Sequence, residues 1–173
     1  PKMLCAFKDG TKTMVEMTAM SNYTGLIPDV IGGHGPKTAP GTEGIKELNE
    51  IFKLKEDGGI LNKHGVVEYV NGIAPGVFVT VSSPNAEIAY QLGYHSMGPG
   101  PLWTLYRPYH LCNLETPLSV ARAVIEGDAT CVAKDGLVSE CITRAKIDLK
   151  AGQTIDGIGG YTTHGSIATA EES

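Results

Sequence analysis

The stretch GVFVTVSS, from Gly76 to Ser83, decides the fold class because it alternates β-branched valines with other residues at the period of a β-strand. Its three valines share one face, which predicts a strand with one apolar side. The preceding run from Gly65 to Asn71 is also rich in β-branched and aromatic residues. The Gly72 to Pro75 link between them predicts that the two runs are adjacent antiparallel strands.

Further elements on both sides of this pair complete the expected fold. Leu102 to Tyr109 reads as a third strand of the same sheet. Thr11 to Thr24 carries methionines at helical spacing and stops at Gly25, so it predicts a helix that we expect to cover the sheet. Glu43 to Lys55 has the pattern of an amphipathic helix. The sequence therefore predicts an α+β fold with an open, largely antiparallel sheet covered by helices.

The last third of the chain predicts one more helix and a hairpin. In Leu114 to Glu126, Thr116 is expected to cap the helix and Pro117 to occupy its first position. Ala129 to Ala133 and Leu137 to Leu149 read as strands on either side of Asp135-Gly136, a typical hairpin turn. We place a domain boundary there, with a main domain over 1–134 and a small β module over 135–173.

Composition excludes several function classes. The net charge is −5, from 19 acidic and 14 basic residues, and no basic run is long enough to follow a phosphate backbone. No stretch approaches the roughly 18 apolar residues of a membrane span. We therefore expect no nucleic-acid partner, no membrane and a cytoplasmic location. The four cysteines lack metal-site spacing and are expected to be small buried residues: Cys5, Cys112, Cys131 and Cys141.

Three long segments resemble a known family. They are FKDGTKTMVEM (residues 7–17), LKEDGGILNKHGVVEYVNGIAPGVFV (54–79) and LYRPYHLCNLETPLSVARAV (105–124). They are similar to the middle portion of homoserine-dehydrogenase-like NAD(P)-dependent oxidoreductases with a C-terminal SAF domain. Some members are 1-deoxy-D-xylulose 5-phosphate reductoisomerase-like enzymes of isoprenoid biosynthesis. The segment AKIDLKAGQTIDGIGGYTTHG (145–165) is similar to the opening of a SAF, or β-clip, module.

The resemblance implies a substrate-side and dimerisation domain of an enzyme that reduces a small carbonyl compound, such as a sugar phosphate or a homoserine-like substrate. The family's Rossmann domain has no counterpart here, because no G-x-G-x-x-G follows a strand and Gly32, Gly33 and Gly35 have other spacing. We therefore expect the chain to be part of a longer homo-oligomeric enzyme that uses NAD(P)H. We expect this part to bind neither NADH nor NADPH by itself, and we assign no metal.

The expected catalytic residues are Lys12, Glu16 and His110. Carbonyl reduction places negative charge on oxygen, so it requires a cationic or acidic donor. Lys12 and Glu16 are one helical turn apart and can share a face, while His110 follows a strand end. The alternative is that Thr13 and Glu16 form a capping box and that Lys12 is a solvated surface charge.

The expected substrate-binding residues are Arg107, Tyr106, His34 and Lys37. Arg107 has the geometry to bind a phosphate or carboxylate with two hydrogen bonds, although it is also free to pair with Glu115. His34 lies in a glycine-rich loop that we expect to close over a ligand, with Lys37 as a phosphate partner. Two other functions stay open, a carbohydrate- or protein-binding module built on the β-clip and a structural, self-associating domain.

Overall fold

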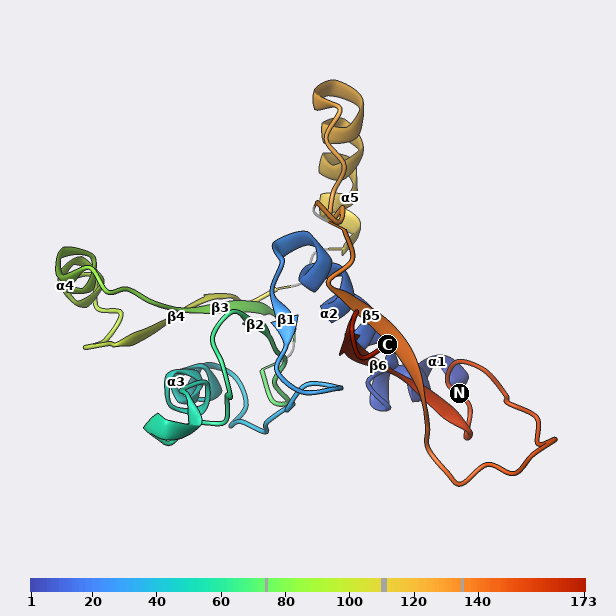
Figure 1. Ribbon diagram of the computed structural model, residues 1–173. Coiled ribbons are helices and arrows are strands. Elements are labelled where there is room, and N and C mark those ends of the chain that lie inside the picture. The colour runs from blue at the N-terminus through green and yellow to red at the C-terminus, as the bar shows by residue number, and fades with distance from the viewer. Residues whose placement is uncertain (74, 110–111, 135) are drawn as a thin grey trace. The chain divides into compact units, whose positions relative to one another are not determined.

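The computed structural model describes residues 1–73, 75–109, 112–134 and 136–173, which contain five α-helices and three two-stranded sheets (Figure 1). Two of the sheets are antiparallel and one is parallel. These features confirm the predicted α+β class with open, mostly antiparallel sheets. The chain divides into two compact units, one with residues 1–34, 65–69 and 121–173, the other with residues 35–64 and 70–120.

The first unit combines two helices with a parallel and an antiparallel strand pair. β1 pairs in parallel with β2, and β5 pairs antiparallel with β6 over seven residue pairs. The bounds are α1 (Lys2–Lys8), α2 (Thr11–Thr24), β1 (Ile27–Pro28), β2 (Val66–Val67), the π-helical η2 (Arg122–Glu126), β5 (Ser139–Ala145) and β6 (Thr163–Thr169).

The core of the first unit lies between α2 and the strands. Met14 and Met17, one turn apart on α2, pack with Val67 of β2 and Ile167 of β6, and all four are buried. Burying each such side chain contributes about 1.5–3 kcal/mol. The helix ends at Gly25 as the sequence predicts, with that glycine in the left-handed conformation.

The sheet that α2 covers differs from the expected one. Its buried methionines contact β6 and β2, whereas the β3–β4 sheet of the second unit is covered by α3. α2 therefore covers β2 of the expected sheet, but the expectation that residues 65–83 and 102–109 form one sheet beneath it is wrong, because β2 pairs with β1 and β3 pairs with β4. The buried methionines of α2 pack against Ile167, which lies on β6, a strand that was not predicted from the sequence.

The second unit is built on a two-stranded ribbon. β3 and β4 belong to one sheet, as predicted, where they pair with each other over six residues, and α4 lies at the tip of their connection (Figure 1). Phe52, at the end of α3, stacks on Phe78 with the ring centroids 5.5 Å apart. The bounds are α3 (Thr42–Ile51), the 3₁₀ turn η1 (Lys55–Asp57), β3 (Val77–Ser82), α4 (Ala86–Tyr94), β4 (Leu102–Arg107) and α5 (Cys112–Ala121), whose last residue belongs to the first unit.

The predicted antiparallel pairing of 65–71 with 76–83 is wrong. Only two residues of the first run form a strand, and that strand pairs with β1. The backbone of Asn71 is bonded elsewhere, because its N–H donates to the carbonyl of Pro36 and its carbonyl accepts from the N–H of Thr38. Residues 65–71 are therefore not the antiparallel partner of β3.

The predicted hairpin around Asp135-Gly136 is also wrong, although Asp135 itself lies outside the described residues. Cys131 has φ of 54°, a left-handed conformation that interrupts the expected strand 129–133. β5 pairs instead with β6, across a long connection. The proposed boundary at residue 135 and the β-clip identity of 135–173 stay predictions.

Two smaller expectations fail as well. α5 begins at Cys112, so Pro117 lies inside the helix rather than at its first position, and Thr116 is not its cap. Cys5, Cys131 and Cys141 are exposed free thiols, not buried residues. In the described part of the chain, no helix has the length and apolar character of a membrane span.

A partly buried ion pair ties α1 and α2 to the end of β5. Nζ of Lys146 lies 2.5 Å from Oδ2 of Asp9, whose other oxygen accepts the N–H of Thr11 at 3.0 Å. Burial by itself would raise the pKa of Asp9, but hydrogen bonds from Lys146 and Thr11 and the positive charge of Lys146 outweigh it and lower the pKa to about 2.

This ion pair predicts acid sensitivity. Since the pKa of Asp9 is lower in the folded state, its contribution is complete above about pH 4 and is lost as pH falls toward 2. Asp9→Asn is expected to lower the free energy of unfolding by about 1–2 kcal/mol at pH 7 and by much less near pH 2. Urea unfolding at both pH values measures this. Asp148→Asn, at an exposed position, is the control; an Asp9 variant that matches it at pH 7 contradicts the prediction.

Candidate functional site

A glycine-rich loop follows β1 and is anchored through its own backbone. The N–H of Gly32 donates to the carbonyl of Ile167 at 2.7 Å, and the N–H of Gly33 donates to the carbonyl of Val30 at 2.9 Å. Both glycines have left-handed φ values, 85° and 66°. The next N–H, that of His34, donates to both carboxylate oxygens of Glu68, at 2.9 and 3.1 Å.

Close neighbours explain why glycine is needed at these two positions. A Cβ atom on Gly32 would lie 2.9 Å from Oγ of Ser166. A Cβ atom on Gly33 would lie 3.1 Å from the ring of Tyr69 and 3.2 Å from Oε2 of Glu68. The loop therefore approaches β6 and the end of β2 more closely than a residue with a side chain allows.

His34 lies between two buried carboxylates. Its Nδ1 is 2.7 Å from Oε1 of Glu68, and its Nε2 is 3.5 Å from Oδ2 of Asp29. The Asp29 and Glu68 side chains are 0% and 4% exposed, whereas the imidazole is 19% exposed. The histidine is thus the member of this cluster that reaches solvent. We call Asp29, His34 and Glu68 the histidine–carboxylate cluster.

Strand geometry brings these side chains together. Asp29 directly follows β1 and Glu68 directly follows β2. Because β1 and β2 are parallel neighbours, both carboxylates lie at the carboxyl edge of this strand pair, where functional side chains are common in α/β proteins. Burial and then the negative charge of Glu68 raise the pKa of the adjacent Tyr69, so its hydroxyl stays neutral at physiological pH.

Of the predicted site residues, His34 is the one that belongs to this cluster. Lys12 is half-buried, with its Nζ 3.8 Å from the ring centroid of Phe7, and Glu16 is exposed. Within the described residues these two side chains form no ion pair. The N-cap of α2 is Gly10, so Thr13 and Glu16 do not form a capping box.

The other predicted residues lie in the second unit or outside the described residues. Arg107 is paired with Glu115, the alternative that the sequence left open, and the hydrogen bond to that carboxylate raises the pKa of Arg107. The hydroxyl of Tyr106 lies 3.2 Å from the carbonyl oxygens of Ile73 and Pro75. Lys37 is exposed, and His110 lies outside the described residues.

Sequence reasoning missed Asp29 and Glu68. Glu68 is 34 positions from His34, and Asp29, although close to His34 in the sequence, follows a short apolar run; neither belongs to a recognisable spacing pattern. The signal that could have found them is positional. Each carboxylate comes immediately after a short β-branched or apolar run, and parallel pairing of those runs brings them to one edge.

The glycine-rich loop does not fit a nucleotide phosphate. A phosphate-binding loop presents free backbone N–H groups at the start of a helix. Here the N–H groups of Gly32, Gly33 and His34 all have partners within the protein, and α3 begins only at Thr42. Among the described residues, no group of histidine, cysteine and acidic side chains has the arrangement of a metal site.

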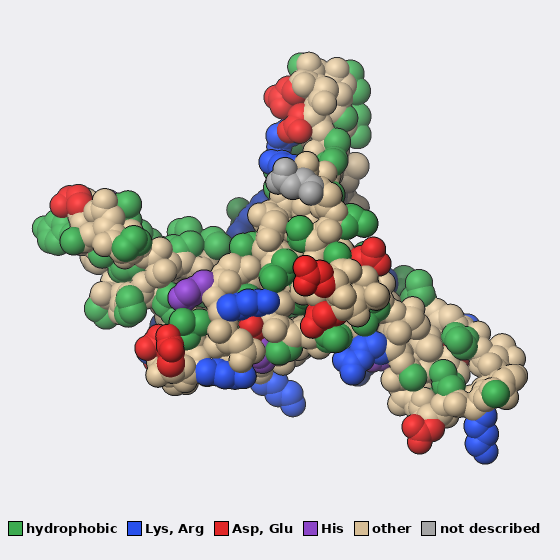
Figure 2. Space-filling view, in the orientation of Figure 1, with side chains coloured by type: hydrophobic (Ala, Val, Ile, Leu, Met, Phe, Trp, Pro, Cys, Tyr) green, Lys and Arg blue, Asp and Glu red, His purple; other side chains and the backbone are tan. Residues whose placement is uncertain are grey.

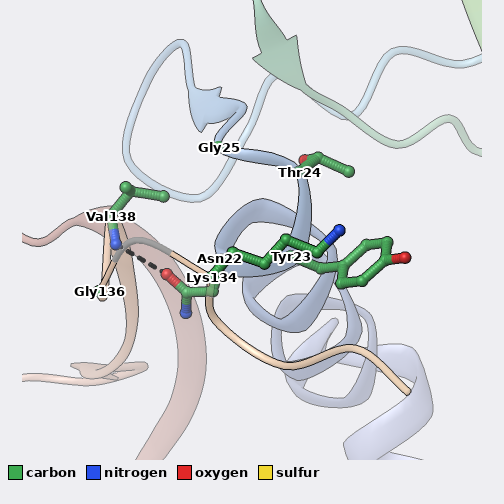
Figure 3. A pocket seen from close by; sticks show the side chains of 7 residues that line it. All are labelled: Asn22, Tyr23, Thr24, Gly25, Lys134, Gly136 and Val138. Atoms are coloured by element: carbon green, nitrogen blue, oxygen red, sulfur yellow. Dashed lines mark hydrogen bonds between the residues drawn. The ribbon is translucent and has the colours of Figure 1, made fainter. Parts of the chain in front are cut away.

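A separate open pocket of about 450 Å³ lies at the end of α2 (Figure 3). The side-chain amide of Asn22 lines this pocket and has a structural role. Its Oδ1 accepts hydrogen bonds from the backbone N–H groups of Val138 at 2.8 Å and Ser139 at 3.1 Å. Nζ of Lys134 lies 4.6 Å from the ring centroid of Tyr23. The pocket contains none of the predicted site residues, so we do not place the reaction there.

A partly exposed histidine held by buried carboxylates is an acid–base arrangement typical of an enzyme's catalytic domain. The protein-family comparison defines the reaction class, because residues 1–116 of the 173 match the catalytic domain of oxidoreductase DRL. The chain therefore belongs to the DRL oxidoreductase family. The comparison with curated proteins found no match.

Crowding at Gly33 gives a test of the loop geometry. Gly33→Ala is expected to lower the free energy of unfolding by about 1–2 kcal/mol through backbone strain and by about 1–3 kcal/mol more through contact with Tyr69 and Glu68. Gly25→Ala is the matched control, because Gly25 has a similar φ of 77° but no atom within 4 Å of its Cβ position. Equal losses in urea unfolding would show that the loop has room at Gly33.

Proposed function

We propose that this chain is the substrate-side domain of an NAD(P)H-dependent oxidoreductase that reduces a small carbonyl compound. The family match over residues 1–116 is the observation that carries the proposal. The histidine–carboxylate cluster supports it, since reduction of a carbonyl requires a group that manages a proton at the new hydroxyl oxygen.

The proposed substrate is a sugar phosphate, in a reductoisomerase-like reaction, or a homoserine-like compound. Arg107 supports an anionic substrate because its guanidinium is 47% exposed and already binds the carboxylate of Glu115. A phosphate or carboxylate has the same hydrogen-bonding geometry and can replace that partner. Lys37, Tyr106 and His34 are the other proposed substrate contacts, and Lys12, Glu16 and His110 are proposed catalytic groups.

The proposed nicotinamide cofactor is held by a separate Rossmann domain of the enzyme. The glycine-rich loop supports this placement of the cofactor. Its backbone N–H groups are already bonded to Ile167, Val30 and Glu68, so they do not bind the phosphates of a nicotinamide cofactor. When bound, the nicotinamide supplies hydride chemistry. The residues of this chain bind and orient the substrate.

We further propose that the enzyme is a homo-oligomer that associates through the β3–β4 ribbon. One face of the ribbon is covered by α3, through Phe52 and Phe78. The other face exposes apolar side chains, and Figure 2 shows hydrophobic side chains along the ribbon and around α4. The exposed side chains on the ribbon are Val77, Val79, Val81 and Leu105. A two-stranded sheet with an uncovered apolar face gains stability from a partner.

The activity assay is oxidation of NADH and NADPH by the full-length enzyme with hydroxy-aldehydes, homoserine-like compounds and sugar phosphates. Turnover of at least one class is expected. Lys12→Ala should then lower kcat by at least about 100-fold, the effect of losing one positioned donor. Lys8→Ala, an exposed lysine on α1, is the control. If the Lys12 variant folds normally and has the same kcat as the Lys8 variant, Lys12 is a surface residue without a catalytic role.

The association is tested by Val79→Lys, which places a charge in the middle of the exposed ribbon face. Sedimentation of the full-length protein should show an oligomer for the wild type and a smaller species for the variant, because burying an unpaired lysine is unfavourable. Val15→Lys, at an exposed valine of α2, should leave the mass unchanged. An unchanged mass for Val79→Lys would exclude this face as the interface.

A further inference from the structure

The two ring nitrogens of His34 have unequal contacts. Nδ1 is 2.7 Å from Oε1 of Glu68, a short hydrogen bond, whereas Nε2 is 3.5 Å from Oδ2 of Asp29, at the outer limit for one. Glu68 therefore holds Nδ1 firmly, and Nε2 is the nitrogen able to exchange its contact for a ligand atom.

Glu68 is itself fixed by the backbone. It accepts the N–H of His34 through both oxygens and the N–H of Tyr69 at 3.3 Å. A carboxylate accepts hydrogen bonds and donates none, so Nδ1 of His34 carries the proton of their shared bond. This bond selects one tautomer, as a carboxylate partner does for catalytic histidines.

The remaining charged and titratable neighbours come from three elements. Asp29 follows β1 and faces Nε2, while Tyr69 follows Glu68 at the end of β2. Arg144 on β5 has its Nη1 3.9 Å from the Cβ position of Gly32, two residues before the histidine. Two carboxylates thus face the one imidazole, Glu68 at Nδ1 and Asp29 at Nε2.

We propose that His34 is a catalytic proton donor of the reductase, acting through Nε2, with Glu68 and Asp29 as positioning residues. The inference rests on the proposed function and deepens it. As the substrate carbonyl is reduced, the Nε2–H bond breaks and an O–H bond forms on the substrate oxygen. The imidazole becomes neutral, keeps Nδ1–H on Glu68, and regains a proton from water. The two electrons come from a reduced nicotinamide bound outside the described residues.

This role is distinct from that of a purely structural clamp. A clamp requires His34 only to bridge the loop and β2, and an uncharged acceptor at position 68 preserves the Nδ1 bond of that bridge. A proton donor also requires the negative charge of Glu68, because that charge stabilises the imidazolium. Glu68→Gln therefore separates the two roles: its amide oxygen still accepts from Nδ1, but the charge is gone.

The first test reads the tautomer without any turnover. In ¹⁵N-histidine NMR of the full-length protein, the His34 signals are identified by their loss in His34→Gln. At alkaline pH the neutral ring is expected to keep its proton on Nδ1 and to lose it from Nε2. A neutral ring protonated on Nε2 would overturn the proposal, and this outcome does not depend on turnover.

The second test uses the carbonyl substrate found for the full-length enzyme. His34→Gln should lower kcat by about 100-fold or more, with a smaller change in KM. Glu68→Gln should move the alkaline limb of the kcat/KM profile to lower pH, which a structural role would not do. His64→Gln, at an exposed histidine, should leave both unchanged.

The outcomes separate the two proposals. A wild-type enzyme that reduces no carbonyl compound overturns the proposed function and this inference with it. An active wild type whose His34→Gln variant is folded and equally fast overturns this inference alone. An active wild type with an unmoved alkaline limb in Glu68→Gln assigns Glu68 and His34 to the structural clamp.

Discussion

The carboxylate of Glu68 holds the glycine-rich loop in place. It accepts the backbone N–H of His34 and the ring Nδ1 of the same residue, so one side chain fixes both the path of the loop and the orientation of its histidine. Because Glu68 is almost fully buried, each of these donors would cost about 1–3 kcal/mol if it were left without a hydrogen-bond acceptor. The close approach of Gly32 and Gly33 to β6 and Tyr69 is possible only with the loop in this position.

The parallel pairing of β1 and β2 is what makes this contact possible. Each strand has only two residues, yet the pairing brings Asp29 and Glu68 from distant parts of the sequence to one edge. The packing of Met14 and Met17 against Val67 and Ile167 supports the same strands from the side of α2. The core of the first unit and its candidate site therefore depend on the same short elements.

Local signals in the sequence were sufficient for most of the helices and for the strands β3 and β4. The left-handed Gly25 ends α2, Asn85 caps α4 through the N–H groups of Glu87 and Ile88, and the alternating valines of β3 pair with β4. Non-local pairing was not predictable in this way. β2 pairs with β1 and β5 with β6 across long connections, and no periodicity specifies those partners.

The same limit applies to the site. His34 was identified from the glycines around it, which is a local pattern, whereas its two carboxylates become visible only when the strand order is known. The family comparison covers residues 1–116 and so includes all three members of the histidine–carboxylate cluster. It establishes the oxidoreductase class, and the geometry around His34 supports the proton donor that we propose for it.

The most direct measurement is a crystal structure of the full-length enzyme with its hydroxylated product bound. The account predicts the product oxygen at about 3 Å from Nε2 of His34, with Nδ1 still bonded to Glu68. A product bound with its hydroxyl on other side chains, and with His34 still enclosed between Asp29 and Glu68, would contradict it.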